Sequence, residues 1–298
     1  MSTLLINCKK FLLVSILAIS GIIPVVAQES SRPYFTVDEM PDLIRILPPP
    51  PDPSSVTFAR DVTQYMWGKD QRNDPVRSEI AFKDAEYSLN NLIRIFSEPF
   101  GMSISFEETP EIYRLMRDFF ATSGNIDRNI KAHYMRERPF MLFNEQTLTP
   151  DLEGSMVVNG SYPSGHTVLG WCAALILSEI NPDNTEELMA RGYMFGESRV
   201  IVGAHWQSDV DAGMLAASVL YAKLHTSPVF LDQMSKARSE FVKKKSGFSS
   251  VATSAVPDHA STDQNIYSLA GYKLPHAPSS GVYIQSGKKI ISHIPSDN

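Results

Sequence analysis

Apolar residues recur at the spacing of an α-helix over most of this chain. Two stretches show apolar side chains at positions i, i+3, i+4 and i+7: Leu89, Leu92, Ile93 and Phe96, and then Ile112, Leu115, Met116 and Phe119. Residues 185–202, 209–225 and 232–245 are predicted to be further helices, and the apolar runs 170–180 and 212–224 to be buried. Alternating β-branched runs are scarce before residue 250. The 298 residues, 43% of them hydrophobic, suffice for one large domain or at most two small ones, with a mainly α-helical core.

The first 27 residues are predicted to be a secretory signal peptide. Lys9 and Lys10 precede a short apolar stretch, residues 11–23, and Val25-Val26-Ala27 offers the small residues that signal peptidase recognises, so cleavage is expected after Ala27. A membrane anchor is the alternative, but the stretch is short, and no later segment reaches the ~20 apolar residues of a membrane span. The mature protein is therefore predicted to be periplasmic or secreted, with no membrane span.

The two ends of the mature chain differ from its helical middle. The prolines at 48–51 and 53 predict an extended entry segment. Residues 28–245 are assigned to one helical domain, and residues 246–298 to a linker and tail. Residues 246–264 are rich in Ser, Thr and Ala and are predicted to be a linker or disordered stretch. Three strand-like pieces follow, at 266–269, 281–284 and 288–291. A sorting or surface role and an ordinary disordered tail both remain open for this segment.

Charge and cysteine content exclude several classes. The signal removes two of the 27 basic residues, which leaves 25 against 33 acidic ones and a net charge near −8. Nucleic acid is an improbable partner for so acidic a chain, and a site for anionic substrates must supply its own positive charge. Cys8 leaves with the signal, so Cys172 has no partner for an intramolecular disulfide. Cys172 is predicted to be buried and inert, with a reactive thiol as the alternative.

Three polar clusters carry the chemistry of the sequence. They are Lys131 with Arg138-Pro139, the run Pro163-Ser164-Gly165-His166, and Ser198-Arg199 with His205 and Asp209. In this order and at these spacings they resemble the signature of the phosphatidic-acid-phosphatase type 2 (PAP2) and vanadium haloperoxidase superfamily. The neighbouring sequence is more similar still to the bacterial class A non-specific acid phosphatases, in Tyr134-Met135-Arg136, in Gly160-Ser161-Tyr162 and in residues 205–209.

This resemblance covers roughly residues 40–245 and implies an all-α fold, a single-domain helical bundle. It implies a secreted acid phosphatase that hydrolyses phosphate monoesters through a phosphohistidine intermediate, with transfer of phosphate to alcohols as a side activity. It also implies a homo-oligomer, a dimer or larger. No metal or other cofactor is predicted, because the remaining histidines form no convincing ligand spacing.

The basic residues suit a phosphoryl group, whose three equatorial oxygens carry negative charge during transfer. Lys131 and Arg138 are seven residues apart, so on one helix they would share a face, about two turns apart. Pro139 disfavours helix at Arg138 and is expected to turn the chain there. Arg199 would be the third cation, and two of the three are planar forks suited to phosphate. Arg136 is predicted to lie elsewhere, on a solvated helix face.

The run 163–166 is predicted to be a tight turn that opens a helix. The N–H groups of Gly165 and His166 would then point at an anion, with help from the helix dipole. Glycine lets an oxygen approach the backbone closely, and the Ser164 hydroxyl adds a donor. By itself, such a run is more often a simple helix N-cap.

Two histidines would divide the catalytic work. Asp209 follows His205 by four residues, near enough to bind one ring nitrogen, fix the tautomer and leave the other nitrogen to attack phosphorus. His166 would be the general acid for the leaving alcohol and then the base for water. The resemblance implies the same roles for His205, His166 and Asp209, with phosphate bound by Lys131, Arg138, Ser164, Gly165 and Arg199.

Other functions fit the sequence less well. A thiol phosphatase needs arginine six residues after its cysteine, where Cys172 has Ser178. Asp209-Val210-Asp211 resembles an aspartyl-phosphate motif but follows no apolar strand. Vanadium haloperoxidase chemistry, a lipid phosphatase and a surface binding protein remain as weaker hypotheses.

One departure from the expected relatives stands out. They often carry a cysteine at the position of Val202, bridged to another in the loop before Gly160, and this chain has neither. The missing bridge predicts a looser loop over residues 140–160.

Overall fold

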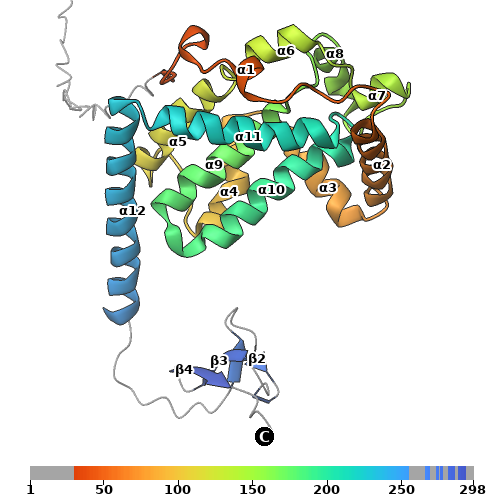
Figure 1. Ribbon diagram of the computed structural model, residues 1–298. Coiled ribbons are helices and arrows are strands. Elements are labelled where there is room, and N and C mark those ends of the chain that lie inside the picture. The colour runs from red at the N-terminus through yellow and green to blue at the C-terminus, as the bar shows by residue number, and fades with distance from the viewer. Residues whose placement is uncertain are drawn as a thin grey trace, which may run out of the picture. The chain divides into compact units, whose positions relative to one another are not determined.

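The computed structural model describes residues 30–254 and, near the C-terminus, residues 266–268, 273–274, 276–277, 281–285 and 288–292. The predicted signal peptide, residues 255–264 of the predicted linker, and Leu269 lie outside this part of the chain. The elements, in chain order (Figure 1), are η1 (Val37–Glu39), α1 (Leu43–Ile46), α2 (Val56–Gln71), α3 (Pro75–Asp84), α4 (Leu89–Phe100), α5 (Pro110–Ser123), α6 (Arg128–Tyr134), α7 (Pro139–Leu142), η2 (Pro150–Leu152), α8 (Glu153–Met156), α9 (Gly165–Ile180), η3 (Pro182–Asn184), α10 (Thr185–Val202), α11 (Gln207–Leu224), α12 (Pro228–Ser254), β1 (Ile266–Ser268), β2 (Lys273–Leu274), β3 (Gly281–Gln285) and β4 (Lys288–Ser292).

The first long helices begin at side chains that satisfy free backbone N–H groups. Ser55 accepts a hydrogen bond from the N–H of Phe58 at the start of α2, and Ser88 accepts one from Asn91 at the start of α4. Helix α4 ends at Gly101, whose φ of 78° is left-handed and suits glycine. The helical spacing of the sequence is therefore reinforced by local start and stop signals.

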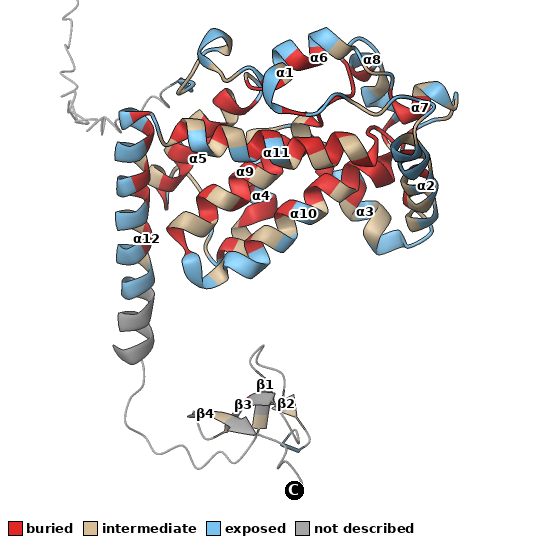
Figure 2. Ribbon diagram, viewed as in Figure 1, coloured by how far each residue is buried: buried red, intermediate tan, exposed pale blue. Residues whose placement is uncertain are grey.

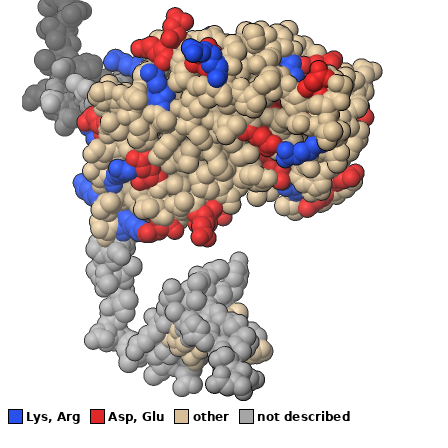
Figure 3. Space-filling model, viewed as in Figure 1, with Lys and Arg blue, Asp and Glu red and all other residues tan. Residues whose placement is uncertain are grey.

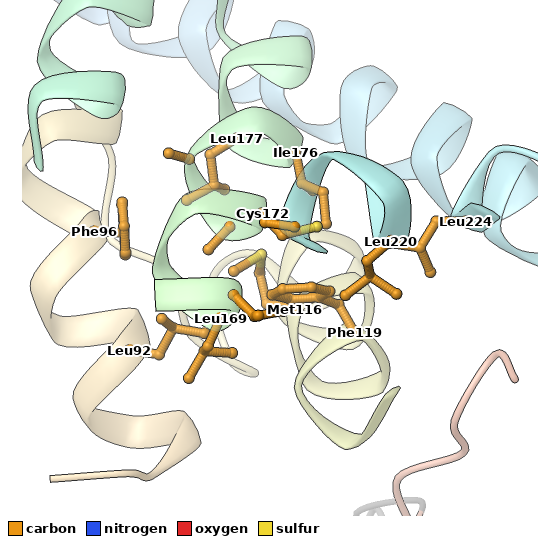
Figure 4. Packing of buried hydrophobic residues seen from close by; sticks show 14 of the residues in the cluster. Leu92, Phe96, Met116, Phe119, Leu169, Cys172, Ile176, Leu177, Leu220 and Leu224 are labelled. Carbon is orange, nitrogen blue, oxygen red and sulfur yellow. The ribbon is translucent and has the colours of Figure 1, made fainter. Parts of the chain in front are cut away.

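Helix α9 is apolar around most of its circumference and lies at the centre of the helical domain. It packs most extensively against α10 and α11 and also contacts α4, α5 and α12. Buried residues follow the surfaces where these helices meet (Figure 2). Figure 4 shows side chains of α4, α5, α9 and α11 converging on one another: Leu92, Phe96, Met116, Phe119, Leu169, Cys172, Ile176, Leu177, Leu220 and Leu224. The all-α prediction is confirmed for the domain that contains the three polar clusters.

The loop that lacks the disulfide is attached to α10 in other ways. The N–H of Leu148 donates to the carbonyl of Val202 on α10, at 3.0 Å. Within the loop, the N–H of Thr147 donates to Glu153 Oε1, at 2.7 Å. Met156 and Val202 belong to the same buried apolar cluster. Val202, where relatives were expected to carry cysteine, thus holds this loop through a backbone hydrogen bond and apolar contacts.

Helix α12 extends beyond the predicted end of the domain. Residues 246–254 are helical, so the prediction of a linker from residue 246 was wrong for these nine residues. No proline interrupts the chain between Pro228 and Pro257, and serine-rich sequence alone does not stop a helix that is already formed. The first half of α12 is fixed to the domain, because Glu240 Oε2 accepts hydrogen bonds from the N–H groups of Glu111 and Ile112 at the start of α5.

The C-terminal strands form one antiparallel sheet in the order β2-β1-β3-β4. Three of them match the predicted pieces, and β2 was missed because a two-residue strand leaves no alternating pattern to detect. Among the described residues, no helix combines the length and apolar character needed to cross a membrane.

Candidate active site

Three buried cations, Lys131, Arg138 and Arg199, come from three different parts of the chain. Helix α6 ends at Met135, whose φ of 40° is left-handed, and Arg138 occupies the position before α7. Lys131 and Arg138 therefore do not share one helix; Arg138 is extended, as the following proline predicted. The two side chains still converge, with exposed fractions of 7% for Lys131, 4% for Arg138 and 2% for Arg199.

Backbone carbonyls hold two of these cations in place. Lys131 Nζ donates to the carbonyls of Gly160, at 2.9 Å, and Pro163, at 2.6 Å. Arg138 donates to the carbonyl of Met156 through Nε and to that of Ala204 through Nη1, both at 2.9 Å. Neutral carbonyls orient a cation without cancelling its charge, so the positive charge remains available to an anion.

Arg199 is different, because its Nε and Nη1 atoms have no hydrogen-bond acceptor among the described residues. Burial lowers the pKa of Arg199 to about 9, that of Arg138 to about 10 and that of Lys131 to about 8. For Lys131, the nearby Asp127 carboxylate opposes this effect of burial. A buried guanidinium with two unused donors is costly, and an anion that accepts from it would remove that cost.

The first turn of α9 presents free backbone N–H groups beside these cations. Ser164 is the N-cap, and its Oγ accepts from the N–H of Thr167 at 3.4 Å. The N–H groups of Gly165 and His166 belong to the first turn and have no acceptor within the helix. Glycine leaves room for Asp127 here, because a Cβ at this position would lie 2.7 Å from Asp127 Oδ2. The predicted turn and helix start are confirmed.

His205 lies in the corner between α10 and α11. Gly203, with a φ of 87°, ends α10 and turns the chain. The ring Nδ1 of His205 lies 3.4 Å from Asp209 Oδ2, and its Nε2 lies 3.1 Å from Arg138 Nη1. Because an arginine can only donate, Nε2 is the unprotonated nitrogen and Nδ1 carries the proton toward Asp209. Burial, together with Arg138 and the other cations, holds the pKa of His205 well below its usual value.

The other histidine faces the same cavity from α9. His166 Nε2 lies 3.1 Å from the carbonyl of Ala85, so this nitrogen carries a proton and Nδ1 is the free one. The ring also makes an edge contact with Tyr87, with ring centroids 4.9 Å apart. Burial and the charge of Arg199 hold the pKa of His166 well below its usual value. An anion bound beside Arg199 would oppose that effect.

These side chains surround one cavity of about 550 Å³. Its walls include six of the eight predicted site residues: Lys131, Arg138, Gly165, His166, Arg199 and His205. A larger hollow of about 850 Å³ lies between α5 and α12 and contains no predicted site residue. On the face shown in Figure 3, basic and acidic side chains are interspersed. The positive charge of Lys131, Arg138 and Arg199 is therefore gathered in the smaller cavity.

Arg136 was misjudged by the sequence analysis. Its side chain is only 8% exposed, and its Nη1 donates to Asp209 Oδ1 at 2.5 Å while Nη2 donates to Asp61 Oδ2 at 2.8 Å. Asp61, on α2, also accepts from the N–H of Ser208 at 2.8 Å. The prediction of a solvated helix face was wrong because α6 has already ended and Asp61, 75 residues away, supplies a partner that no spacing rule could reveal.

Asp209 is fixed on both of its oxygens. Besides Arg136, it accepts from Ser161 Oγ at 2.5 Å and from the N–H of Trp206 at 2.9 Å, which caps the start of α11. Ser161 Oγ also lies 3.3 Å from His205 Nδ1. Ser161 belongs to the Gly160-Ser161-Tyr162 motif, and the sequence alone gives no signal for its role. The part of the chain that the structure describes contains no group of His, Cys, Asp and Glu arranged to hold a metal ion.

Comparison with known proteins places this site in a family. Residues 119–229 match the model of the PAP2 superfamily, and this range contains every predicted site residue. The chain is 43% identical over 213 residues to a non-specific acid phosphatase of Providencia stuartii, which covers 71% of this chain and 86% of the relative. It is 41% identical over 217 residues to one of Salmonella typhimurium, covering 72% and 86% of the two chains. An acid phosphatase of Zymomonas mobilis is 34% identical over 217 residues, covering 73% and 82%.

Proposed function

We propose a reaction path for this chain on the premise that it belongs to the PAP2 superfamily and, within it, to the non-specific acid phosphatases. The chain is an acid phosphatase, and we infer that it hydrolyses phosphate monoesters through a phosphohistidine on His205. The observation that carries this proposal is His205 Nε2, unprotonated and 3.1 Å from Arg138 Nη1 at the wall of a cavity lined by buried cations.

In the first step, the lone pair of His205 Nε2 attacks phosphorus. A P–N bond forms, the bond between phosphorus and the ester oxygen breaks, and the leaving oxygen takes a proton from protonated His166. The His205 ring gains positive charge, which Asp209 stabilises through the Nδ1 proton. Lys131, Arg138 and Arg199 bind the equatorial oxygens, with the N–H groups of the first turn of α9.

In the second step, water attacks the phosphorus of phosphohistidine and gives a proton to His166, which is now neutral. The P–N bond breaks, the lone pair returns to Nε2, and phosphate leaves. An alcohol in place of water would receive the phosphate group, which is the proposed side activity. Since the pKa of His166 is held low, its protonation requires acid or the charge of bound phosphate, so maximal activity is expected at acidic pH.

The finer assignments of location and assembly belong to the same proposal. Residues 1–27 would be removed during secretion, and the mature enzyme would act in the periplasm or outside the cell as a dimer or larger homo-oligomer. N-terminal sequencing of the mature protein would show Gln28 first if cleavage follows Ala27.

Hydrolysis of a chromogenic phosphate ester tests the proposal, with a chelator present throughout. His205→Ala should reduce kcat by at least about 10³-fold, because the covalent route disappears. His225→Ala is the matched control. His225 is half-buried at the end of α11, where it hydrogen-bonds the carbonyl of Tyr221 and the carboxylate of Glu179, and its variant should keep wild-type activity. Turnover that requires a metal, or a His205→Ala variant as active as the control, would overturn the mechanism. Bromide oxidation with added vanadate would instead support haloperoxidase chemistry.

A further inference from the structure

Asp127 is a buried carboxylate that the proposed mechanism does not use. It precedes α6 as its N-cap residue, but its side chain makes no capping hydrogen bond. It is 6% exposed and lines the same cavity as His166, Arg199 and His205. A carboxylate in a cavity built to receive an anion calls for an explanation.

The contacts of Asp127 leave its charge poorly compensated. Its Oδ2 lies 3.8 Å from Lys131 Nζ, and Lys131 already donates to two backbone carbonyls at shorter distances. The carboxylate lies close to the backbone of Gly165, since a Cβ built there would be 2.7 Å from Asp127 Oδ2. Asp127 therefore borders the N–H groups proposed to bind phosphate.

An ionised Asp127 and a phosphate dianion would repel each other in this low-dielectric space. We propose that Asp127 takes up a proton from solvent when the phosphate group of the substrate enters the cavity, so that the site binds the anion together with one proton. The protonated carboxyl can donate one hydrogen bond, and the proton returns to solvent when the product phosphate leaves. Asp127 would therefore make the affinity for substrate higher at acidic pH. This inference rests on the proposed function.

The surrounding charges act in both directions. From its own helix, Asp127 faces Lys131 and the exposed Arg128; from the other elements around the cavity come Arg138, His166, Arg199 and His205, with the Tyr87 hydroxyl. Burial raises the pKa of Asp127, and Lys131 partly offsets this. The bound anion adds a second negative charge, which raises that pKa further. The carboxylate is ionised above its pKa, so its opposition to anion binding grows as the pH rises.

Asp127→Asn keeps the shape of the side chain and removes its titration. Asp127→Ser is a second variant, because serine is favoured at a helix N-cap and should preserve the start of α6 if asparagine does not. Asp70→Asn is the matched control, since Asp70 is exposed on α2. Sulfate is the probe: it stays a dianion from about pH 4 to about pH 8, so any change in its binding reports on the protein.

The inhibition constant of sulfate should be measured against hydrolysis of a chromogenic ester. At about pH 7, both Asp127 variants should bind sulfate about tenfold more tightly than the wild type, which corresponds to one pKa unit of linkage. Near pH 4.5 the proteins should agree within about twofold, because the wild-type carboxyl is then largely protonated both before and after sulfate binds. The KM for the ester should change in parallel, with kcat changing less. The control should follow the wild type throughout.

Two outcomes would overturn the inference. Variants that bind sulfate more weakly than the wild type at about pH 7 would mean that ionised Asp127 serves to keep Lys131 charged. If the ratio of variant to wild-type sulfate affinity were the same at about pH 7 and near pH 4.5, Asp127 would not change its protonation when sulfate binds. Neither outcome touches the phosphohistidine proposal, whereas a wild type that sulfate fails to inhibit even at acidic pH would contradict the cation cavity itself.

Discussion

The two ends of helix α9 are surrounded by opposite kinds of side chain. Toward its C-terminus, Leu177 is fully buried among apolar residues of neighbouring helices (Figure 4). At its first turn, Gly165 and His166 share a cavity with buried cations, one of which has two unused donors. Burial stabilises the first region and penalises the second. The apolar region therefore supplies the stability that allows the polar region to hold charges in an unfavourable state, ready for an anion.

Arg199 should show the largest separation of activity from stability. Arg199→Met should lower kcat/KM by about 10²–10³-fold, because a charged contact to the transferring phosphoryl group is lost. The free energy of unfolding should rise by about 1 kcal/mol or more, because a buried guanidinium with two unused donor atoms is replaced by an apolar side chain. Steady-state kinetics and urea denaturation measure the two effects.

Arg77→Met serves as the control for that variant. Arg77 lies on α3, and its donors are used, on Ser198 Oγ and Glu197 Oε2, both at 3.0 Å. Its loss should decrease the free energy of unfolding by about 1–2 kcal/mol with little change in kcat/KM. If Arg199→Met were the less stable of the two variants, the two regions of α9 would not differ as described.

Arg136 should have an intermediate effect on activity, because it acts through Asp209. Arg136→Met leaves Asp61 and Asp209 without their shared partner, so the free energy of unfolding should fall by about 3 kcal/mol. Looser placement of Asp209 should lower kcat about 10–100-fold with a smaller change in KM. Arg136→Lys should recover only part of this, because one ammonium cannot bridge both carboxylates as a planar fork does. Equal losses for Arg136→Met and His205→Ala would instead assign Arg136 a direct role in the chemistry.

Leu177 should have the smallest effect on activity and a clear effect on stability. Leu177→Ala opens a cavity in the apolar region and should reduce the free energy of unfolding by about 2–5 kcal/mol. The kcat/KM per folded molecule should stay within about twofold of the wild-type value, since the rigid first turn of α9 does not depend on this side chain. A loss of activity well beyond the loss of folded protein would show that the two ends of α9 are not independent.

The sequence predicted the parts of this structure that depend on neighbours along the chain. The spacing of apolar residues found α4, α5 and α10, and the order Ser164-Gly165-His166 before an apolar run found the start of α9. The predicted site residues converge because helix ends bring them together. Local pattern could not reveal that α6 ends before Arg138, nor that the buried partner of Arg136 is Asp61 on a distant helix. Asp127 escaped notice because an acidic residue at a helix start is ordinarily a cap.

The most direct test of the account is to trap the phosphorylated enzyme. A labelled phosphate ester is mixed with the enzyme, the reaction is stopped in alkali, where phosphohistidine survives, and the protein is cut with trypsin. Cleavage after Arg199 and Lys223 places His205 alone among histidines in the peptide 200–223, whereas His166 lies in the peptide 137–191, because trypsin does not cut between Arg138 and Pro139. The account predicts label on the peptide 200–223. Label on the peptide 137–191, or rapid turnover with no labelled peptide at any time, would contradict it.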